Sequence, residues 1–176
     1  EEYGTSGVPI EALDTVAALP GVDRTSPSIA GGVIVLDSEG AAIQTGGAPA
    51  EGFAYIPADR LVGEPQEFVS GEPPAQPGQI ALNESAAERG SLSVGDDTTV
   101  LTIGQGTITV TISGIYALGA DTGGYIGAMF TEEQASQLFT DGRHVGFVDV
   151  AGDGSMTPEQ LRDEIAAALP DLKVQT

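Results

Sequence analysis

The 176-residue chain contains no cysteine, no tryptophan, a single lysine and a single histidine. The absence of cysteine excludes disulfides, thiolate catalysis and cysteine-ligated zinc. One histidine in a chain without cysteine forms no recognisable catalytic triad, so we interpret His144 as an exposed loop residue that precedes a strand. A chain of this length buries roughly 70% of its unfolded surface, so it needs neither a metal nor a disulfide to fold.

Long hydrophobic runs are also absent. No stretch approaches the ~20 apolar residues that are needed to span a bilayer. The chain shows no signal-peptide pattern at Glu1. The sequence therefore predicts a folded segment that does not itself cross a membrane.

Positive charge is scarce. Six basic residues stand against 26 acidic residues, which gives a net charge of −20. The excess is spread evenly, with −11 through Gly90 and −9 beyond it. Nucleic-acid binding requires a basic surface and is excluded, and adhesion to anionic lipid head groups is disfavoured for the same reason. We interpret the acidic residues as a well-solvated surface.

The segment 78–115 has the most distinctive order of elements in the chain. A short strand at 80–82 is followed by Asn83 in an N-cap position, a helix of one to two turns, and Gly90, which we expect at the C′ position with positive φ. A Gly95–Asp96 turn comes next. Three threonines then alternate with three apolar residues over 107–112, which predicts the second strand of a hairpin.

The flanking parts of the chain read as mixtures of helices and strands. Before residue 67 we expect a helix that starts at Pro9, then strands near 22, at 33–36 and at 53–56. After a glycine-rich loop at 119–124 we expect strands at 126–130 and 145–150, with a capping box opening a helix at Thr131 and another at Thr157. Residues 16–22 and 166–172 share a helix, Leu-Pro stop and strand pattern, which predicts two similar units with helices on one face of a sheet.

The order of the elements in the central segment resembles the extracytoplasmic domain of FtsX-like, MacB-type ABC transporter permeases. Sequences of that family commonly run through a glycine and proline turn, a strand, a small helix ending in Gly-x-Leu, an x-Val-Gly-Asp motif, a hairpin and a strand ending in Gly-Ile or Gly-Val. The matching residues here are Gly71, Pro74, Gly78, Ile80, Leu82, Ala87, Gly90, Leu92, Val94, Gly95, Asp96, Gly114 and Ile115.

This resemblance implies an α+β fold. A porter-like mixed α/β lobe is formed by both chain ends, and a small β-rich lobe is inserted in its middle. We expect residues 1–66 to form the first part of the porter-like lobe, 67–117 the insert, and 118–176 the second part. The segment would lie between the first and second transmembrane helices of a longer permease, so that both of its ends face the membrane.

Candidate chemical sites are weak. Asp149, Asp153 and Thr157 fall at calcium-loop spacing, but Gln160 replaces the bidentate glutamate, so we interpret this stretch as an ordinary strand-to-helix loop. Tyr116 and Tyr125 flank the 119–124 loop, and we predict that they line a ligand or partner groove. We expect no catalytic residue, no metal and no cofactor.

The resemblance implies a non-catalytic domain on the extracytoplasmic side of the plasma membrane, which transmits ATP-driven motion to a substrate or an extracytoplasmic partner. Its partners would be a cytoplasmic ATP-binding subunit, reached through the permease's membrane helices, and a second permease subunit in a homo- or heterodimer. A peptide, a lipoprotein or a cell-wall enzyme are further candidate partners. Two alternatives stay open: a secreted or cell-surface binding module, and a hydrolase lobe that uses paired carboxylates.

Overall fold

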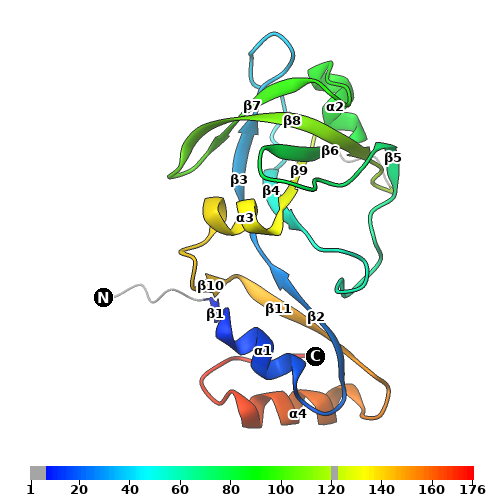
Figure 1. Ribbon diagram of the computed structural model, residues 1–176, viewed down its shortest axis with the longest axis vertical. Coiled ribbons are helices and arrows are strands. Elements are labelled where there is room, and N and C mark those ends of the chain that lie inside the picture. Colours follow the sequence, from blue (N-terminus) through cyan, green and yellow to red (C-terminus); the bar gives the residue numbers. More distant parts are fainter. Residues whose placement is uncertain (1–6, 120–122) are drawn as a thin grey trace. The chain divides into compact units, whose positions relative to one another are not determined.

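The computed structural model describes residues 7–119 and 123–176 and divides into two compact units (Figure 1). Residues 120–122, part of the loop predicted at 119–124, lie outside the described residues, as do residues 1–6. We call Glu1–Ser28, Ile56–Pro65 and Thr140–Thr176 the terminal unit. We call Ile29–Tyr55 and Gln66–Phe139 the barrel unit.

The barrel unit is built on one seven-stranded sheet. Its strands are β3 (Ala30–Val35), β4 (Ala50–Tyr55), β5 (Phe68–Gly71), β6 (Gln79–Asn83), β7 (Asp97–Thr102), β8 (Gly106–Tyr116) and β9 (Ile126–Thr131). They lie in the order β5-β8-β6-β9-β4-β3-β7, and β7 also pairs with β8. That extra ladder closes six strands into a ring, while β5 pairs with β8 outside it. Closure removes the free sheet edges that would otherwise recruit another chain.

Every second side chain along these strands is buried, and these side chains fill the inside of the ring. On β3, β7 and β8, one set of alternate residues is buried: Val33, Val35, Thr98, Val100, Thr102, Val110 and Ile112. The strand predicted over 107–112 is confirmed and runs on to Tyr116. Its threonines face outward and its apolar residues inward, as period-2 patterning requires.

Helix α2 (Glu84–Gly90) follows β6, and helix α3 (Glu132–Phe139) follows β9. Asn83 holds the N-cap position of α2, as predicted, but its side chain makes no capping hydrogen bond. The prediction that Gly90 takes positive φ is wrong. Gly90 ends the helix and Ser91 is the left-handed residue, with φ of 51°. Gly90 is required for space, because a Cβ there would lie 2.6 Å from the Cδ1 atom of Ile43.

The terminal unit is a small α/β layer. It contains β1 (Val8–Pro9), α1 (Glu11–Ala17), β2 (Val22–Ser28), β10 (His144–Val145), β11 (Phe147–Gly152) and α4 (Pro158–Ala168). Strand β1 pairs with β10 and β2 pairs with β11, both antiparallel. His144 thus begins a strand rather than lying in a loop.

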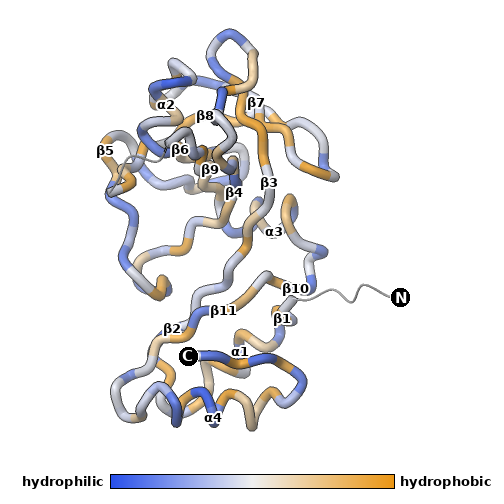
Figure 2. Tube along the Cα trace, turned by 180° about the vertical axis from the view of Figure 1, so that it is seen from behind, coloured by the Kyte–Doolittle hydropathy of each residue, from blue (hydrophilic) through white to orange (hydrophobic). Residues whose placement is uncertain are grey.

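Helices α1 and α4 share one core. Val16, Leu161 and Ile165 are buried together, with Val22, Val150 and Leu169 packed around them. Figure 2 shows the alternation of hydrophilic and hydrophobic residues along α4 that this one-sided packing requires. Thr157 and Gln160 form the predicted capping box, each bonding the other's backbone N–H. The two helix–stop patterns noted in the sequence therefore lie side by side, although the residues after Pro170 form no strand.

The lobe boundaries expected from the sequence differ from these units. The sequence predicts an insert at 67–117, whereas the barrel unit also holds residues 29–55 and 118–139. The reason is the ring. Strand β9 pairs with β4 in parallel and with β6 antiparallel, and β3 pairs with β7, so distant segments complete one sheet. The chain is α+β, and within the described residues no helix has the length and apolarity needed to cross a membrane.

Candidate interaction site

Tyr116 does not line a groove. Its side chain is fully buried at the end of β8, with 0% exposure, and its hydroxyl donates a hydrogen bond to the carbonyl oxygen of Gly127 at 3.1 Å. Burial, with Tyr125 nearby, raises the pKa of Tyr116 well above its ordinary value. The prediction that this residue forms part of an exposed site is therefore wrong, because its ring packs with Ala81 and Met129 under Phe53 and Phe68.

A cluster of aromatic rings surrounds Tyr116. Phe53 and Tyr116 meet edge to face with centroids 6.5 Å apart, Phe68 and Tyr116 lie 6.2 Å apart, and Tyr55 packs edge to face on Phe68. Phe53, Tyr55 and Phe68 are half-buried, as is Leu118. Half-exposed aromatic rings on a rigid sheet are typical of protein-binding surfaces. This aromatic cluster is the candidate that replaces the predicted tyrosine pair.

Tyr125 remains close to a surface. Its hydroxyl lies 3.4 Å from a carboxylate oxygen of Glu51, and its pKa is raised by partial burial and by that carboxylate. Buried Asn83 holds the backbone around it: the amide Nδ2 donates to the carbonyl of Tyr125, and Oδ1 accepts from the N–H of Gly127. Asn83 thus serves the loop before β9 instead of capping its own helix.

Arg89 fixes the same loop from the other side. Its guanidinium donates to the carbonyl oxygens of Gln44, Gly124 and Tyr125, at 2.6 to 3.0 Å, and to that of Ser85 one turn back in α2. The planar fork of arginine suits several acceptors at once, which lysine does not. The guanidinium of Arg89 therefore binds backbone carbonyl oxygens and holds the loop before β9.

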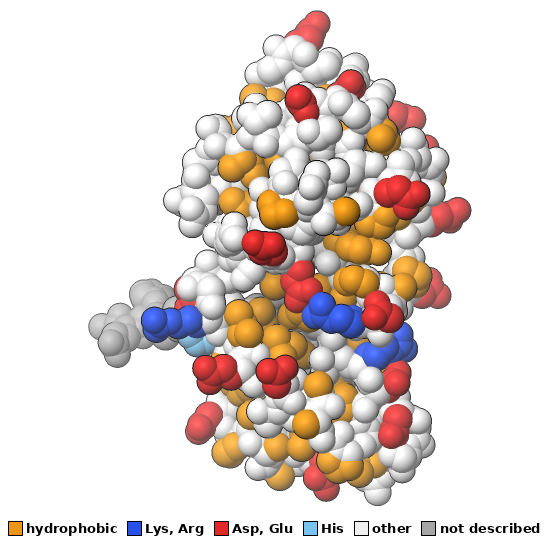
Figure 3. Space-filling view, viewed as in Figure 1, with side chains coloured by type: hydrophobic (Ala, Val, Ile, Leu, Met, Phe, Trp, Pro, Cys, Tyr) orange, Lys and Arg blue, Asp and Glu red, His pale blue; other side chains and the backbone are white. Residues whose placement is uncertain are grey.

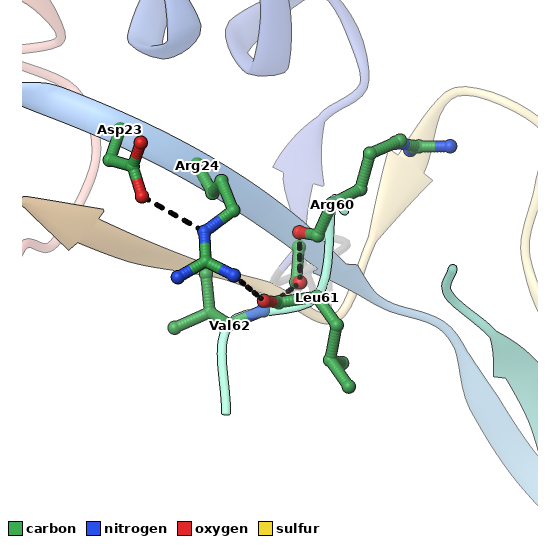
Figure 4. Close-up of polar contacts among 6 residues, drawn as sticks. Asp23, Arg24, Arg60, Leu61 and Val62 are labelled. Carbon is green, nitrogen blue, oxygen red and sulfur yellow. Dashed lines mark hydrogen bonds and ion pairs between the residues drawn. The ribbon is translucent and has the colours of Figure 1, made fainter. Parts of the chain in front are cut away.

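A second candidate site lies in the terminal unit, where side chains of β2 bind the backbone of a segment between two strands of the barrel unit. Residues 56–65, which we call the strap, link β4 to β5, yet they belong to the terminal unit while both strands belong to the barrel unit. Figure 4 shows how β2 holds the strap. The buried hydroxyl of Ser26 accepts from the N–H of Val62 at 2.7 Å and donates to the carbonyl of Arg60 at 2.9 Å. Arg24 adds a bond to the carbonyl of Leu61, while its Nε faces Asp23.

The terminal unit also contains a groove of about 360 Å³ with a mixed polar and apolar lining. Val8 of β1 lies on its wall, with Phe147 of β11 and Ile165 of α4, and the last residues of the chain, through Thr176, complete it. The first described strand and the last residue of the chain therefore reach the same groove.

The sequence singled out two further places, His144 and the loop before α4. The ring Nδ1 of His144 lies 2.7 Å from a carboxylate oxygen of Asp141, which also accepts from the N–H groups of Arg143 and His144. Asp153 accepts from the N–H of Ser155 in the loop before α4. Over residues 7–119 and 123–176, no three acidic or histidine side chains are grouped to hold a metal ion.

No protein-family model matches the sequence, and no curated protein matches it either. Solved structures do match. The extracellular domain of the noncanonic ABC-type transporter YknZ from Gram-positive bacteria is similar with a TM-score of 0.66 and 14% identity, over 95% of this chain and 84% of that chain. The periplasmic region of MacB from Actinobacillus actinomycetemcomitans is similar with a TM-score of 0.63 and 13% identity. The match covers 93% of this chain and 75% of that chain. A domain of a permease protein from Porphyromonas gingivalis is similar with a TM-score of 0.54 and 16% identity. The match covers 90% of this chain and 74% of that chain.

The chain therefore has the fold of extracytoplasmic domains of ABC-type transporter permeases, as the central segment predicts. At these identities the likeness concerns the fold. The sequence signal that found it was the order of small elements and glycines. The aromatic cluster and the strap left no comparable signal, because their members come from distant segments.

Proposed function

We propose that this chain is the extracytoplasmic domain of an ABC transporter permease subunit, and that it transmits ATP-driven motion to a substrate or a partner outside the membrane. The observation that carries the proposal is the fold, which matches such domains over nearly the whole chain. In this reading the terminal unit is the porter-like lobe and the barrel unit is its insert. The domain lies on the outer side of the plasma membrane.

The arrangement of the chain ends supports the proposal. Val8 and Thr176 line one groove of the terminal unit, so membrane helices before and after the chain would both attach to this unit. Two attachments to one rigid layer carry a rotation or a tilt into it more directly than one flexible tether would.

The path of the chain supports the transmission of that motion. The chain passes between the units after residues 28, 55, 65 and 139. The strap returns to the terminal unit and is fastened there by Ser26 and Arg24. Motion of the terminal unit would reach the barrel unit through four stretches of backbone.

No catalytic residue and no cofactor enter this proposal. ATP hydrolysis would take place on a cytoplasmic ATP-binding subunit, and a second permease subunit would complete the membrane part, in a homo- or heterodimer. A peptide, a lipoprotein or a cell-wall enzyme would be the outer partner. The aromatic cluster and Tyr125 are the surface that we assign to it.

The first test is the sequence on either side of the chain. A permease of this kind has one apolar stretch of about 20 residues shortly before residue 1 and three after residue 176. A secreted or surface binding module would show a signal peptide, repeats or a wall anchor instead, and would refute the proposal.

The second test is motion. The chain lacks cysteine, so Thr15→Cys, in a whole permease whose cysteines outside this chain are replaced, places the spin label at one exposed site on α1. We expect the label-to-label distance between two labelled permease subunits to change when vanadate traps ADP on the ATP-binding subunit after hydrolysis. An unchanged distance in a transporter whose ATPase is active would contradict the proposal.

A further inference from the structure

One exposed face of the barrel unit is almost free of charge. It consists of the outward residues of three neighbouring strands and the tip of the β7–β8 hairpin: Ala30, Gly32, Ile34, Asp97, Thr99, Leu101, Ile103, Thr107, Thr109 and Thr111. We call it the outer face. Among these ten residues Asp97 alone is ionised, although the chain as a whole carries a net charge of −20.

The end of the outer face near the hairpin tip is apolar. Ile103 is 87% exposed and Ile34 is 48% exposed. Ile34 lies directly opposite Leu101 in the ladder, and the Cδ1 atom of Ile103 lies over Gly32. These side chains form one continuous patch on a rigid sheet. Isolated exposed residues need no explanation, but a contiguous apolar patch indicates a contact surface.

The rim of the outer face carries a carboxylate at each end. Glu51 lies directly opposite Gly32 on β4 and is exposed, and Asp97 lies on the same face at the far end of β7. The stretches 29–55 and 66–139 hold twelve acidic residues and one basic residue, Arg89, which is spent on backbone carbonyls. In Figure 3, acidic side chains and no basic ones are visible over α2 and β8 at the top of the view.

We propose that the outer face docks a cationic, amphipathic polypeptide, whose apolar side chains cover Ile34, Leu101 and Ile103 while its lysines or arginines face Glu51 and Asp97. A second copy of this chain would bring the same acidic rim against this one, and like charges facing each other are unfavourable. A partner with the opposite charge gains both the apolar contact and the field of the unit.

This inference gives a partner outside the membrane a second contact surface besides the aromatic cluster, so it rests on the proposed extracytoplasmic role. Its failure remains distinguishable from the failure of that role. Binding is measured on the chain as it stands, whereas the transporter role is decided by flanking membrane helices and by motion during ATP hydrolysis.

The probe is a fluorescein-labelled amphipathic helix of leucine and lysine, titrated with the chain and followed by anisotropy. We expect the double variant Ile34→Ser/Ile103→Ser to weaken binding by more than about tenfold, because two exposed isoleucines lose their apolar contact. The control is Val69→Ser, which removes an aliphatic side chain from β5, outside this face. Val69 is 49% exposed, which matches Ile34 at 48%. We expect it to change the affinity by less than about twofold.

A second arm tests the charge. Glu51→Gln/Asp97→Asn should weaken binding and flatten its dependence on salt, and a leucine–glutamate peptide should not bind. Three results would overturn the proposal: equal weakening by Val69→Ser, unchanged affinity of the isoleucine double variant, or self-association of the wild-type chain that this double variant abolishes. The last would assign the outer face to a second copy.

Discussion

The hydroxyl of Tyr116 reaches across to β9 and donates a hydrogen bond to the carbonyl oxygen of Gly127, 3.1 Å away. Gly127 leaves no room for a side chain, because a Cβ there would collide with that same hydroxyl and would approach the rings of Tyr125 and Phe53. The hydroxyl of Tyr116 therefore occupies the space that a side chain at position 127 would need.

Replacing both members of this pair tests that relationship. Tyr116→Phe should lower the free energy of unfolding by about 1–2 kcal/mol, because the buried carbonyl of Gly127 loses its partner. Gly127→Ala should cost about 1–3 kcal/mol through overpacking. In the Tyr116→Phe protein, Gly127→Ala should lower the free energy of unfolding by at least about 0.5 kcal/mol less than in the wild type, because the hydroxyl that the new Cβ would meet is gone. Urea unfolding of the four proteins gives the cycle, and strictly additive costs would contradict the pairing.

The end of α2 offers a reciprocal test at two adjacent residues. Gly90→Ala should destabilise the chain by about 1 kcal/mol, because the new Cβ meets the buried side chain of Ile43. Ser91→Gly should stabilise it by about 0.5–1 kcal/mol, because Ser91 holds φ of 51° and glycine takes this region without strain. Denaturant midpoints decide the matter. Gly90→Ala would also destabilise a chain in which Gly90 were the left-handed residue, so the sign of Ser91→Gly decides: a loss of stability would restore the prediction made from the sequence.

Ser26 should hold the strap in place. Ser26→Ala leaves the buried N–H of Val62 without its acceptor, so the free energy of unfolding should fall by about 1–3 kcal/mol. Hydrogen exchange should accelerate at the amide of Val62 more than at amides of α4. Ser38→Ala, an exposed change in the barrel unit, is the control and should leave the strap amides unaltered. Equal exchange at Val62 in all three proteins would count against this role.

Asp141 should make stability depend on acid pH. Hydrogen bonds from the ring of His144 and from the N–H groups of Arg143 and His144 lower the pKa of Asp141 to about 2. A carboxyl group whose pKa is depressed on folding contributes stability above its unfolded pKa of about 3.9, and loses it as pH falls through the folded value. Asp141→Asn should therefore be less stable than the wild type at pH 6, and the difference should shrink between about pH 4 and pH 2. A difference that stays constant over this range, in urea unfolding at each pH, would disprove the linkage.

Much of the local structure could be predicted from residue order. The strand over 107–112 follows from alternation, and the start of α4 at Pro158 follows from the Thr157–Gln160 box. These features depend on side chains within a few residues of one another, so the sequence states them directly. The same holds for the ordered turns and glycines that indicated the permease-type fold.

Other features depended on partners far along the chain. Gly90 was expected to serve backbone conformation, but Ile43, 47 residues away, makes it a packing residue. Asn83 was expected to cap its helix, but it is bound to the backbone of Tyr125 and Gly127. Tyr116 was expected at a surface, but Phe53 of β4 and Phe68 of β5 cover its ring.

The sequence by itself determined the alternation of β8, the capping box that opens α4 and the acidity of the surface, because these follow from neighbouring residues and from composition. Only the tertiary structure decided that six strands close on themselves, that residues 56–65 return to the terminal unit, and that a face with Ile34, Ile103 and a single charged residue lies outside. The physical reason is that pairing between distant strands depends on all the segments together, and no single segment encodes its partner.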